Sequence, residues 1–336
     1  MLQLERSFTV KGMTLRNRLV MPPMATERSA PDGSVSDKTV EYYEEKAADE
    51  TLGLIITEHS FILPQGKASP SQSGLDSNDK ITGYRRLTDT IHKHGTKVAA
   101  QLSHAGGRAV SRVTGETIVA PSVEAVRELE EPWRAMTQED IHTVVDAFAQ
   151  AARRAKEAGF DAVEIHSAHS YLLNQFYSPY FNHRTDAYGG SPENRIRIHL
   201  EVIHAVRQAV GADYPVLLRL GTCDYAEGGA TIQDAIAACV AFEQAGVDLL
   251  DISGGAQGYT VKGREGVQGY FAPETTAIKQ AVGIPVLLTG GITEPAAAEQ
   301  LLSDGAADLI GVGRAILKNS HWGKKAFATL RCDQNQ

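Results

Sequence analysis

The segment Gly159-Phe-Asp-Ala-Val-Glu-Ile-His166 contains the joint that decides the fold. A glycine follows a helical pattern, an aspartate comes two residues later, and the run at 162–166 has the length and composition of a buried strand. The same joint recurs as Gly246-Val-Asp248 and as Gly305-Ala-Ala-Asp308. A joint that recurs along a chain is typical of one supersecondary unit used several times.

Outward from this joint, short apolar runs alternate with longer amphipathic ones over the whole chain. We expect strands at residues 19–24, 54–58, 97–102, 162–166, 216–220, 249–252, 286–289 and 309–312. We expect helices at residues 38–50, 79–94, 138–158, 192–210, 232–245, 273–282 and 295–303, with a last helix after Arg314. Eight successive β-then-α units with short connections predict an α/β fold, the closed (β/α)8 or TIM barrel, rather than an open doubly wound sheet.

Local signals at the helix ends support this alternation. We expect the glycines that follow the predicted helices to take the left-handed conformation that ends a helix: Gly53, Gly95, Gly159, Gly211, Gly246, Gly283 and Gly305. Ser191 followed by Pro192 predicts a helix start, and Thr137 with Asp140 resembles a capping box.

The 336 residues are expected to form one domain, 1–336, because barrels of this type commonly run this long. One segment, residues 103–136, interrupts the alternation after the third predicted strand and is rich in glycine, proline and charge. A long connection after a barrel strand lies at the catalytic face, so we interpret it as a lid or a wall of the site. A surface excursion is the alternative.

Composition and charge exclude several classes of protein. Apolar residues make up 42% and charged residues 22%, as in ordinary globular proteins. The net charge of −8, without a basic cluster, argues against nucleic acid as a partner. Cys223, Cys239 and Cys332 form no C-x-x-C pair, which argues against a disulfide framework or a cysteine metal site. Without a signal-peptide pattern or an apolar run of roughly 20 residues, we expect a cytoplasmic protein with no membrane partner.

In a barrel of this type the active site is built from residues at the C-terminal ends of the strands. The residues found there are Pro22, Pro23, Met24 and Ala25 after the first strand, His59 after the second, Gln101, His104 and Arg108 around the end of the third, His166, His169 and Tyr171 after the fourth, Arg219 in the fifth, Gly290 and Gly291 after the seventh, and Gly313 and Arg314 after the eighth.

Two of these groups indicate an anion site. The loops Gly290-Gly291 and Gly313-Arg314 can present backbone N–H groups to a phosphate, and the arginine can add a bidentate charge. A tight turn is the alternative for each glycine pair. Arg219 lies in a strand expected to be buried, so it needs an anionic partner, either a protein carboxylate or a cofactor anion.

The pair His166 and His169 allows three interpretations. It could hold a metal, but the spacing is not His-Glu-x-x-His and no third ligand is evident. It could be a structural hydrogen-bonded pair. Because both residues follow a strand end and Tyr171 is close, we favour donors for a substrate oxygen, with no metal.

These residues resemble the old yellow enzyme family of flavin ene-reductases, in its bacterial branch. The most specific match is His166-Ser-Ala-His-Ser-Tyr-Leu-Leu-Asn-Gln-Phe176, which continues into Asn182-His-Arg-Thr-Asp-Ala-Tyr-Gly-Gly-Ser-Pro-Glu-Asn-Arg195. Asn17-Arg18, Gln101-Leu-Ser-His104 and Gly313-Arg314 match as well, and the resemblance covers nearly the whole chain.

The resemblance implies an NAD(P)H-dependent FMN oxidoreductase of the NADPH dehydrogenase or ene-reductase type. Its FMN is tightly bound and non-covalent, NADPH or NADH is the reductant, and the activated C=C bond of an enone or enal, or a quinone, is reduced. The roles implied are these: Pro22, Pro23, Met24 and Ala25 line the isoalloxazine, Gln101 binds its pyrimidine edge, Arg219 lies near N1, Gly291, Gly313 and Arg314 take the phosphate, His166 and His169 bind the substrate carbonyl, and Tyr171 protonates the α-carbon.

Three positions depart from the family pattern. The bacterial branch often has cysteine where this chain has Ala25 and tyrosine where it has Glu27, so we expect Glu27 to make the substrate entrance acidic. His59 stands where a small residue is common; we place it beside the cofactor and leave its role open.

Two other functions stay open. One is a flavin-free barrel lyase or isomerase with His166 as its acid or base. The other is a flavin-binding or redox-sensing protein without enone turnover. No subunit interface can be read from the sequence, which is compatible with a homo-oligomer.

Overall fold

The computed structural model describes residues 2–122 and 133–333. Part of the expected lid or wall, residues 123–132, lies outside the described residues. Within the described part, no helix is both long and apolar enough to cross a membrane.

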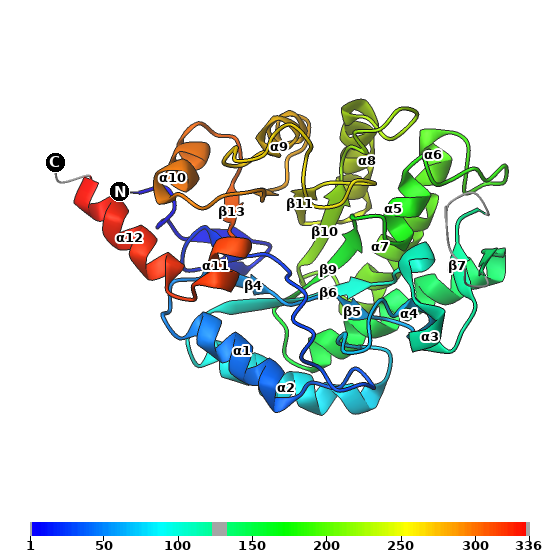
Figure 1. Cartoon of the computed structure of the whole chain (residues 1–336), viewed down its shortest axis with the longest axis horizontal. Helices are drawn as coiled ribbons and strands as arrows, with labels where there is room; N and C mark the ends of the chain where they lie inside the picture. Colours follow the sequence, from blue (N-terminus) through cyan, green and yellow to red (C-terminus); the bar gives the residue numbers. More distant parts are fainter. Residues whose placement is uncertain (1, 123–132, 334–336) are drawn as a thin grey trace.

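The expected strands form a closed parallel barrel (Figure 1). Its strands are β3 (Leu19–Met21), β4 (Leu54–Ile56), β6 (Lys97–Ser103), β9 (Ala162–Ser167), β10 (Val216–Gly221), β11 (Leu249–Ser253), β12 (Val286–Leu288) and β13 (Leu309–Gly311). They pair in this order, and β13 pairs with β3 to close the ring. The prediction of a (β/α)8 barrel is therefore confirmed. A short further strand, β5 (Ser60–Phe61), adds to β6.

The helices lie around the outside of the barrel (Figure 1). They are α1 (Asp37–Ala47), α2 (Ile81–His92), α4 (Gln138–Glu157), α6 (Pro192–Arg195), α7 (Arg197–Val210), α8 (Ile232–Ala245), α9 (Ala272–Lys279), α10 (Pro295–Ser303), α11 (Arg314–Lys318) and α12 (Trp322–Asp333). The helix predicted at 192–210 is divided into α6 and α7, and the predicted caps are present: Ser191 accepts from the Asn194 backbone, and Thr137 and Asp140 form a capping box. Apolar helix faces and the outward side chains of the strands form the main core.

Several short elements lie outside the regular alternation. They are the hairpin strands β1 (Phe8–Val10) and β2 (Met13–Leu15), the helices α3 (Ser111–Thr114) and α5 (Leu172–Tyr177), the parallel pair β7 (Ile118–Ala120) and β8 (Trp133–Ala135), and 3-10 turns at Pro64–Gly66, Asn78–Lys80 and Gly106–Arg108. The hairpin was not predicted. Its side chains Val10, Met13 and Leu15 pack with strand residues such as Leu54 and Leu249 at the N-terminal end of the barrel, away from the strand ends expected to carry the site.

The aspartate of the recurring helix-to-strand joint accepts the same kind of backbone hydrogen bond at all three joints. The Oδ2 atoms of Asp161, Asp248 and Asp308 accept the backbone N–H of Val98 (2.9 Å), Val216 (2.9 Å) and Val286 (3.0 Å), each at or near the start of the preceding strand of the barrel. In each case the aspartate N–H returns a bond to the carbonyl of that same valine. The joint therefore sets the register of neighbouring strands.

The glycine prediction holds for five joints and fails for two. Gly95, Gly159, Gly211, Gly246 and Gly305 have positive φ angles, whereas Gly53 and Gly283 do not. Gly53 has no room for a side chain, because a Cβ atom there would lie 2.3 Å from the Asn17 carbonyl oxygen. Close approach of two backbones, rather than a left-handed turn, explains this glycine.

Candidate active site

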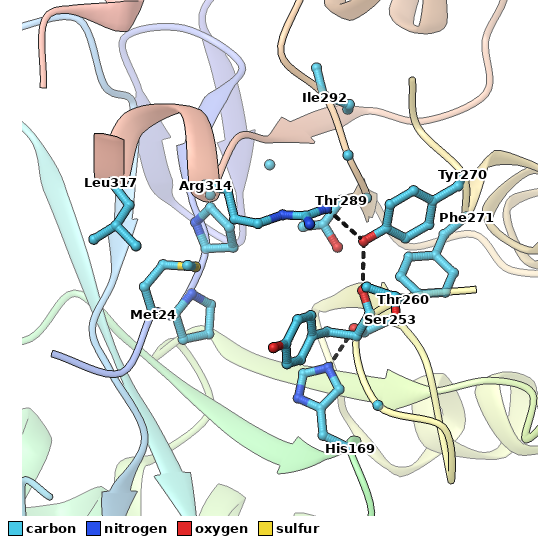
Figure 2. A pocket seen from close by; sticks show the side chains of 18 of the residues that line it. Met24, His169, Ser253, Thr260, Tyr270, Phe271, Thr289, Ile292, Arg314 and Leu317 are labelled. Carbon is cyan, nitrogen blue, oxygen red and sulfur yellow. Dashed lines mark hydrogen bonds between the residues drawn. The ribbon is translucent and has the colours of Figure 1, made fainter. Parts of the chain in front are cut away.

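A cavity of about 1020 Å³ opens at the C-terminal ends of the barrel strands (Figure 2). It is lined by the residues expected at the site except Glu27, His104 and Arg108. Three of them are in register across three neighbouring strands: Gln101 on β6 lies opposite the buried Glu164 on β9, and His166 on β9 lies opposite Arg219 on β10. The parallel barrel thus brings together residues that are far apart in the sequence.

Arg219 meets a carboxylate of the next strand. It lies opposite Asp251 on β11, with its Nε 3.2 Å from Asp251 Oδ2, and both side chains are buried. The contact lacks hydrogen-bond geometry, so Nε has no hydrogen-bond partner in the described part of the chain. Of the two partners left open for Arg219, the protein carboxylate is present, and the guanidinium keeps an unsatisfied donor at the cavity.

A second carboxyl group lies beside this pair. Gln101 donates from Nε2 to Glu164 Oε2 at 2.8 Å, and Glu164 is fully buried. Burial and the neighbouring Asp251 raise the pKa of Glu164 above its ordinary value, while Arg219 opposes the rise. Arg219 therefore faces two carboxyl groups: the carboxylate of Asp251, and Glu164, which favours its neutral form.

The two histidines enter the cavity as neutral groups. Burial, together with the nearby Arg219 charge, lowers the pKa of both His166 and His169 well below the ordinary value. Their ring centroids are 5.3 Å apart, and His169 Nε2 lies 2.7 Å from Ser253 Oγ (Figure 2). His166 Nδ1 has no protein partner among the described residues. No cluster of three or more potential metal ligands occurs within 2–122 and 133–333, so nothing there completes a metal site for the pair.

The backbone around His169 is unusual. His169 and Ser170 have φ angles of 58° and 60°, a region that ordinary side chains rarely adopt. The His169 N–H donates to the Gly254 carbonyl at 3.1 Å, which holds this turn against the loop after β11. The turn directs the His169 ring across the cavity toward Ser253 and places Tyr171 at the start of α5.

Tyr171 lies beside both His166 and His59. Its ring centroid is 5.1 Å from that of His166, and its hydroxyl oxygen is 3.0 Å from His59 Nε2. Burial raises the pKa of Tyr171 to about 12, so the hydroxyl keeps its proton at neutral pH.

The opposite wall is formed by the two glycine loops (Figure 2). Gly291 has a φ of 69°, and a Cβ atom there would lie 2.7 Å from the Tyr270 ring. Arg314, at the start of α11, donates from Nη2 to the Tyr270 hydroxyl at 3.3 Å. A Cβ atom at Gly313 would lie 3.0 Å from Met24 Sδ. Close packing and the positive φ angle therefore require glycine at 291, whereas at 313 a side chain would have to displace the Met24 side chain.

Glu27 does not line the cavity, and neither do His104, which is buried and accepts the Gly106 N–H, and Arg108. The Glu27 side chain is exposed, its φ angle is 54°, and its carboxylate accepts a hydrogen bond from Ser69 Oγ at 2.7 Å. The carboxylate lies outside the cavity lining, but its charge is close enough to Tyr171 to contribute, after burial, to the raised pKa of that hydroxyl.

Several lining or supporting residues were missed from the sequence, among them Asp251, Ser253 and Tyr270, together with most of the lining between residues 258 and 271. Asp251 is a charged residue in a strand expected to be buried, the same signal that selected Arg219, and Ser253 directly follows the predicted strand 249–252, so both could have been found. Tyr270 lies outside the helices and strands, and no local pattern marks it.

The cavity fits the FMN that the resemblance implies. Its volume is that of a cofactor site, and its lining combines apolar side chains with a few polar ones. The buried Arg219 keeps an unsatisfied donor there, and the exposed Arg314 has no ion-pair partner in the described part of the chain. Both cations are suited to an anionic, hydrogen-bonding ligand.

Comparison with known proteins agrees with this geometry. The sequence profile of the NADH:flavin oxidoreductase / NADH oxidase family matches residues 4–332. The NADPH dehydrogenase of Halalkalibacterium halodurans is 41% identical over 326 residues, which are 96% of this chain and 94% of that protein. The old yellow enzyme homologue from Zymomonas mobilis has a TM-score of 0.85 at 29% identity, covering 97% of this chain and 93% of that one. Morphinone reductase in complex with tetrahydroNAD has a TM-score of 0.83 at 27% identity, covering 97% and 90%.

Proposed function

Because this chain belongs to the NADH:flavin oxidoreductase / NADH oxidase family, that of the old yellow enzymes, and is therefore an FMN-dependent NAD(P)H oxidoreductase, we propose that it reduces the activated C=C bond of α,β-unsaturated carbonyl compounds. The observation that carries the proposal is the convergence of two neutral imidazoles and one neutral tyrosine hydroxyl on the cavity. The family assignment leaves the flavin-free alternative without support.

We assign the cofactor to the part of the cavity between these three groups and the two glycine loops. The segment from Pro22 to Ala25 would line the ring, Gln101 and Arg219 would bind its polar edge, and Gly291, Gly313 and Arg314 would hold the phosphate. Bound FMN supplies two-electron hydride chemistry between the nicotinamide and the alkene.

His166 and His169 bind and polarise the substrate carbonyl. Addition of a hydride to the β-carbon moves negative charge onto the carbonyl oxygen, and neutral N–H donors stabilise that charge in a site with little water. The pairing of His169 with Ser253 holds one ring in position, while His166 Nδ1 has no partner within residues 2–122 and 133–333 that would compete with a ligand.

Tyr171 delivers the proton that completes the reaction. The nicotinamide loses a hydride and becomes NAD(P)+, the β-carbon gains that hydride, and the α-carbon gains a proton from the Tyr171 hydroxyl. Water then returns a proton to Tyr171. The raised pKa of Tyr171 supports this role, because the group must be protonated when the substrate binds.

The experiment is Tyr171→Phe, measured separately for each half of the reaction. Anaerobic bleaching of the FMN absorbance by NADPH or NADH needs no proton donor on the substrate side and should stay near the parental rate. Reduction of an enone should slow by about 10²- to 10⁴-fold, as expected for loss of a positioned general acid. Reduction of a quinone, which needs no carbon protonation, should persist.

Tyr42→Phe is a matched control, because the Tyr42 hydroxyl is buried on α1 without a hydrogen-bond partner among the described residues. It should leave both substrates unaffected. Equal slowing with enone and quinone in Tyr171→Phe would contradict proton donation, and a yellow protein that neither nicotinamide bleaches would indicate a flavin-binding protein instead.

A further inference from the structure

The Tyr171 hydroxyl contacts a residue whose role the family pattern leaves open. His59 lies with its Nε2 3.0 Å from the Tyr171 oxygen, and the two rings stack with centroids 5.4 Å apart and an interplanar angle of 22°. A hydrogen bond between an imidazole and a hydroxyl can run in either direction. The direction decides whether the tyrosine proton points into the bond or away from it.

Gln72 determines the donor and acceptor roles of His59. The Ala68 backbone N–H donates to Gln72 Oε1 at 2.6 Å, which identifies Oε1 as the acceptor and leaves the amide nitrogen Nε2 on the other side. That nitrogen lies 3.3 Å from His59 Nδ1 and 3.2 Å from the His59 carbonyl oxygen. The same nitrogen also lies 3.5 Å from Ser103 Oγ, a longer contact than the one to Nδ1. An amide nitrogen only donates, so in its contact with His59 Nδ1 the ring nitrogen accepts.

A neutral imidazole with an accepting Nδ1 carries its hydrogen on Nε2. Burial lowers the pKa of His59 below its ordinary value, so the neutral form is favoured. His59 Nε2–H therefore donates to the Tyr171 oxygen. The opposite tautomer would place its Nδ1–H against the Gln72 NH₂ group, two donors facing each other in a buried site.

We propose that His59 is a positioning residue for Tyr171: its Nε2–H donates a hydrogen bond to the Tyr171 oxygen, and it accepts none from the Tyr171 hydroxyl. The inference rests on the proposed function of Tyr171 as proton donor. Because the hydroxyl oxygen accepts from His59, its own hydrogen is directed to the substrate. When the Tyr171 O–H bond breaks and the C–H bond forms at the α-carbon, the oxygen keeps the electron pair, and His59 Nε2–H stabilises the resulting phenolate until water reprotonates it.

The tautomer can be tested on the unaltered FMN-loaded protein. With ¹⁵N-labelled histidine, the His59 signals, assigned by their loss in His59→Gln, should show a hydrogen on Nε2 and none on Nδ1 at pH 7. A hydrogen on Nδ1, or on both nitrogens, would overturn the proposal. This measurement does not depend on catalysis.

A double-mutant cycle tests the functional part. His59→Leu should slow enone reduction by roughly 10- to 100-fold, the effect of losing a hydrogen bond to a charged group, and should slow quinone reduction, measured per bound FMN, far less. His59→Gln, whose amide can donate to the tyrosine oxygen, should restore most of the rate. In the Tyr171→Phe background, His59→Leu should have no further effect, because no phenolate forms there.

The outcomes separate this inference from the one on which it rests. An equal loss from His59→Leu with and without the Tyr171 hydroxyl, or no rescue by His59→Gln, would show that His59 acts through pocket shape and would overturn the positioning role. If Tyr171→Phe alone leaves enone reduction unchanged, the proton-donor assignment fails, even where the ¹⁵N spectra show the expected tautomer.

Discussion

Two arginines reach the same cavity but are held in different ways. Arg219 is buried in β10 and is paired with Asp251 on β11. Arg314 is exposed at the start of α11. Within the described part of the chain, its side chain donates one hydrogen bond, to the Tyr270 hydroxyl. A buried, compensated cation cannot be removed without leaving a buried carboxylate unpaired, whereas an exposed one can. Arg314 is therefore the position at which phosphate binding can be tested without disturbing the fold.

We expect Arg314→Ala to weaken FMN binding by about 1.5–3 kcal/mol, because it removes a charge-assisted hydrogen bond to the phosphate. Fluorescence titration of the flavin-stripped protein measures the affinity. Riboflavin, which has no phosphate, should bind the variant and the parent equally, and Lys324→Ala on α12 removes a cation elsewhere as a control. If the loss is as large for riboflavin as for FMN, Arg314 does not hold the phosphate.

At the level of elements, the barrel depends on side-chain acceptors that bind the start of a neighbouring strand. Asp308 precedes β13, accepts the N–H of Val286 on β12, and lies 2.6 Å from Lys279 Nζ on α9. One carboxylate thus joins two strands and a helix. The backbone bond and the ion pair contribute differently, because an unsatisfied buried N–H costs more than a partly exposed ion pair contributes.

We expect Asp308→Ala to lower the free energy of unfolding by about 1–3 kcal/mol, since the Val286 N–H loses its acceptor. Lys279→Met removes only the ion pair and should cost about 0–1 kcal/mol. Urea unfolding at a fixed FMN concentration compares the two variants. A Lys279→Met loss that matches the Asp308→Ala loss would assign the stabilisation to the ion pair rather than to the strand joint.

For the molecule as a whole, buried neutral histidines link stability to pH. Burial lowers the pKa of His199 to about 3 and that of His104 to about 4. His199 on α7 connects three elements: its Nε2 lies 2.8 Å from Ser167 Oγ on β9, and its ring stacks on Phe242 of α8. Between the folded pKa and the ordinary value of 6.5, the unfolded chain binds a proton that the folded protein does not.

Stability contributed by His199 should therefore be present above pH 6.5 and be lost as the pH falls toward 3. From pH 7 to pH 5 the parent should lose about 2 kcal/mol through this one group. His199→Gln, which does not titrate, should show a shallower decrease over that range, whatever its stability at pH 7. Urea unfolding at pH 7, 6 and 5 provides the comparison, and parallel curves for parent and variant would show that His199 is not buried neutral.

The amino-acid pattern predicted the eight β-then-α units, several helix caps and the cavity residues at the strand ends, such as His166, Tyr171 and Arg219, but not the lining between residues 258 and 271. Helices and strands follow from the spacing of apolar residues and from caps, which are local, and parallel strands bring their C-terminal ends to one edge wherever they stand in the chain. Features that depend on contacts between residues distant in the sequence could be read only from the folded structure. Examples are the place of the β1–β2 hairpin, the carboxylate beside Arg219, and the contact of His59 with Tyr171, 112 positions away. Such contacts depend on side-chain packing across the barrel, which no local pattern records.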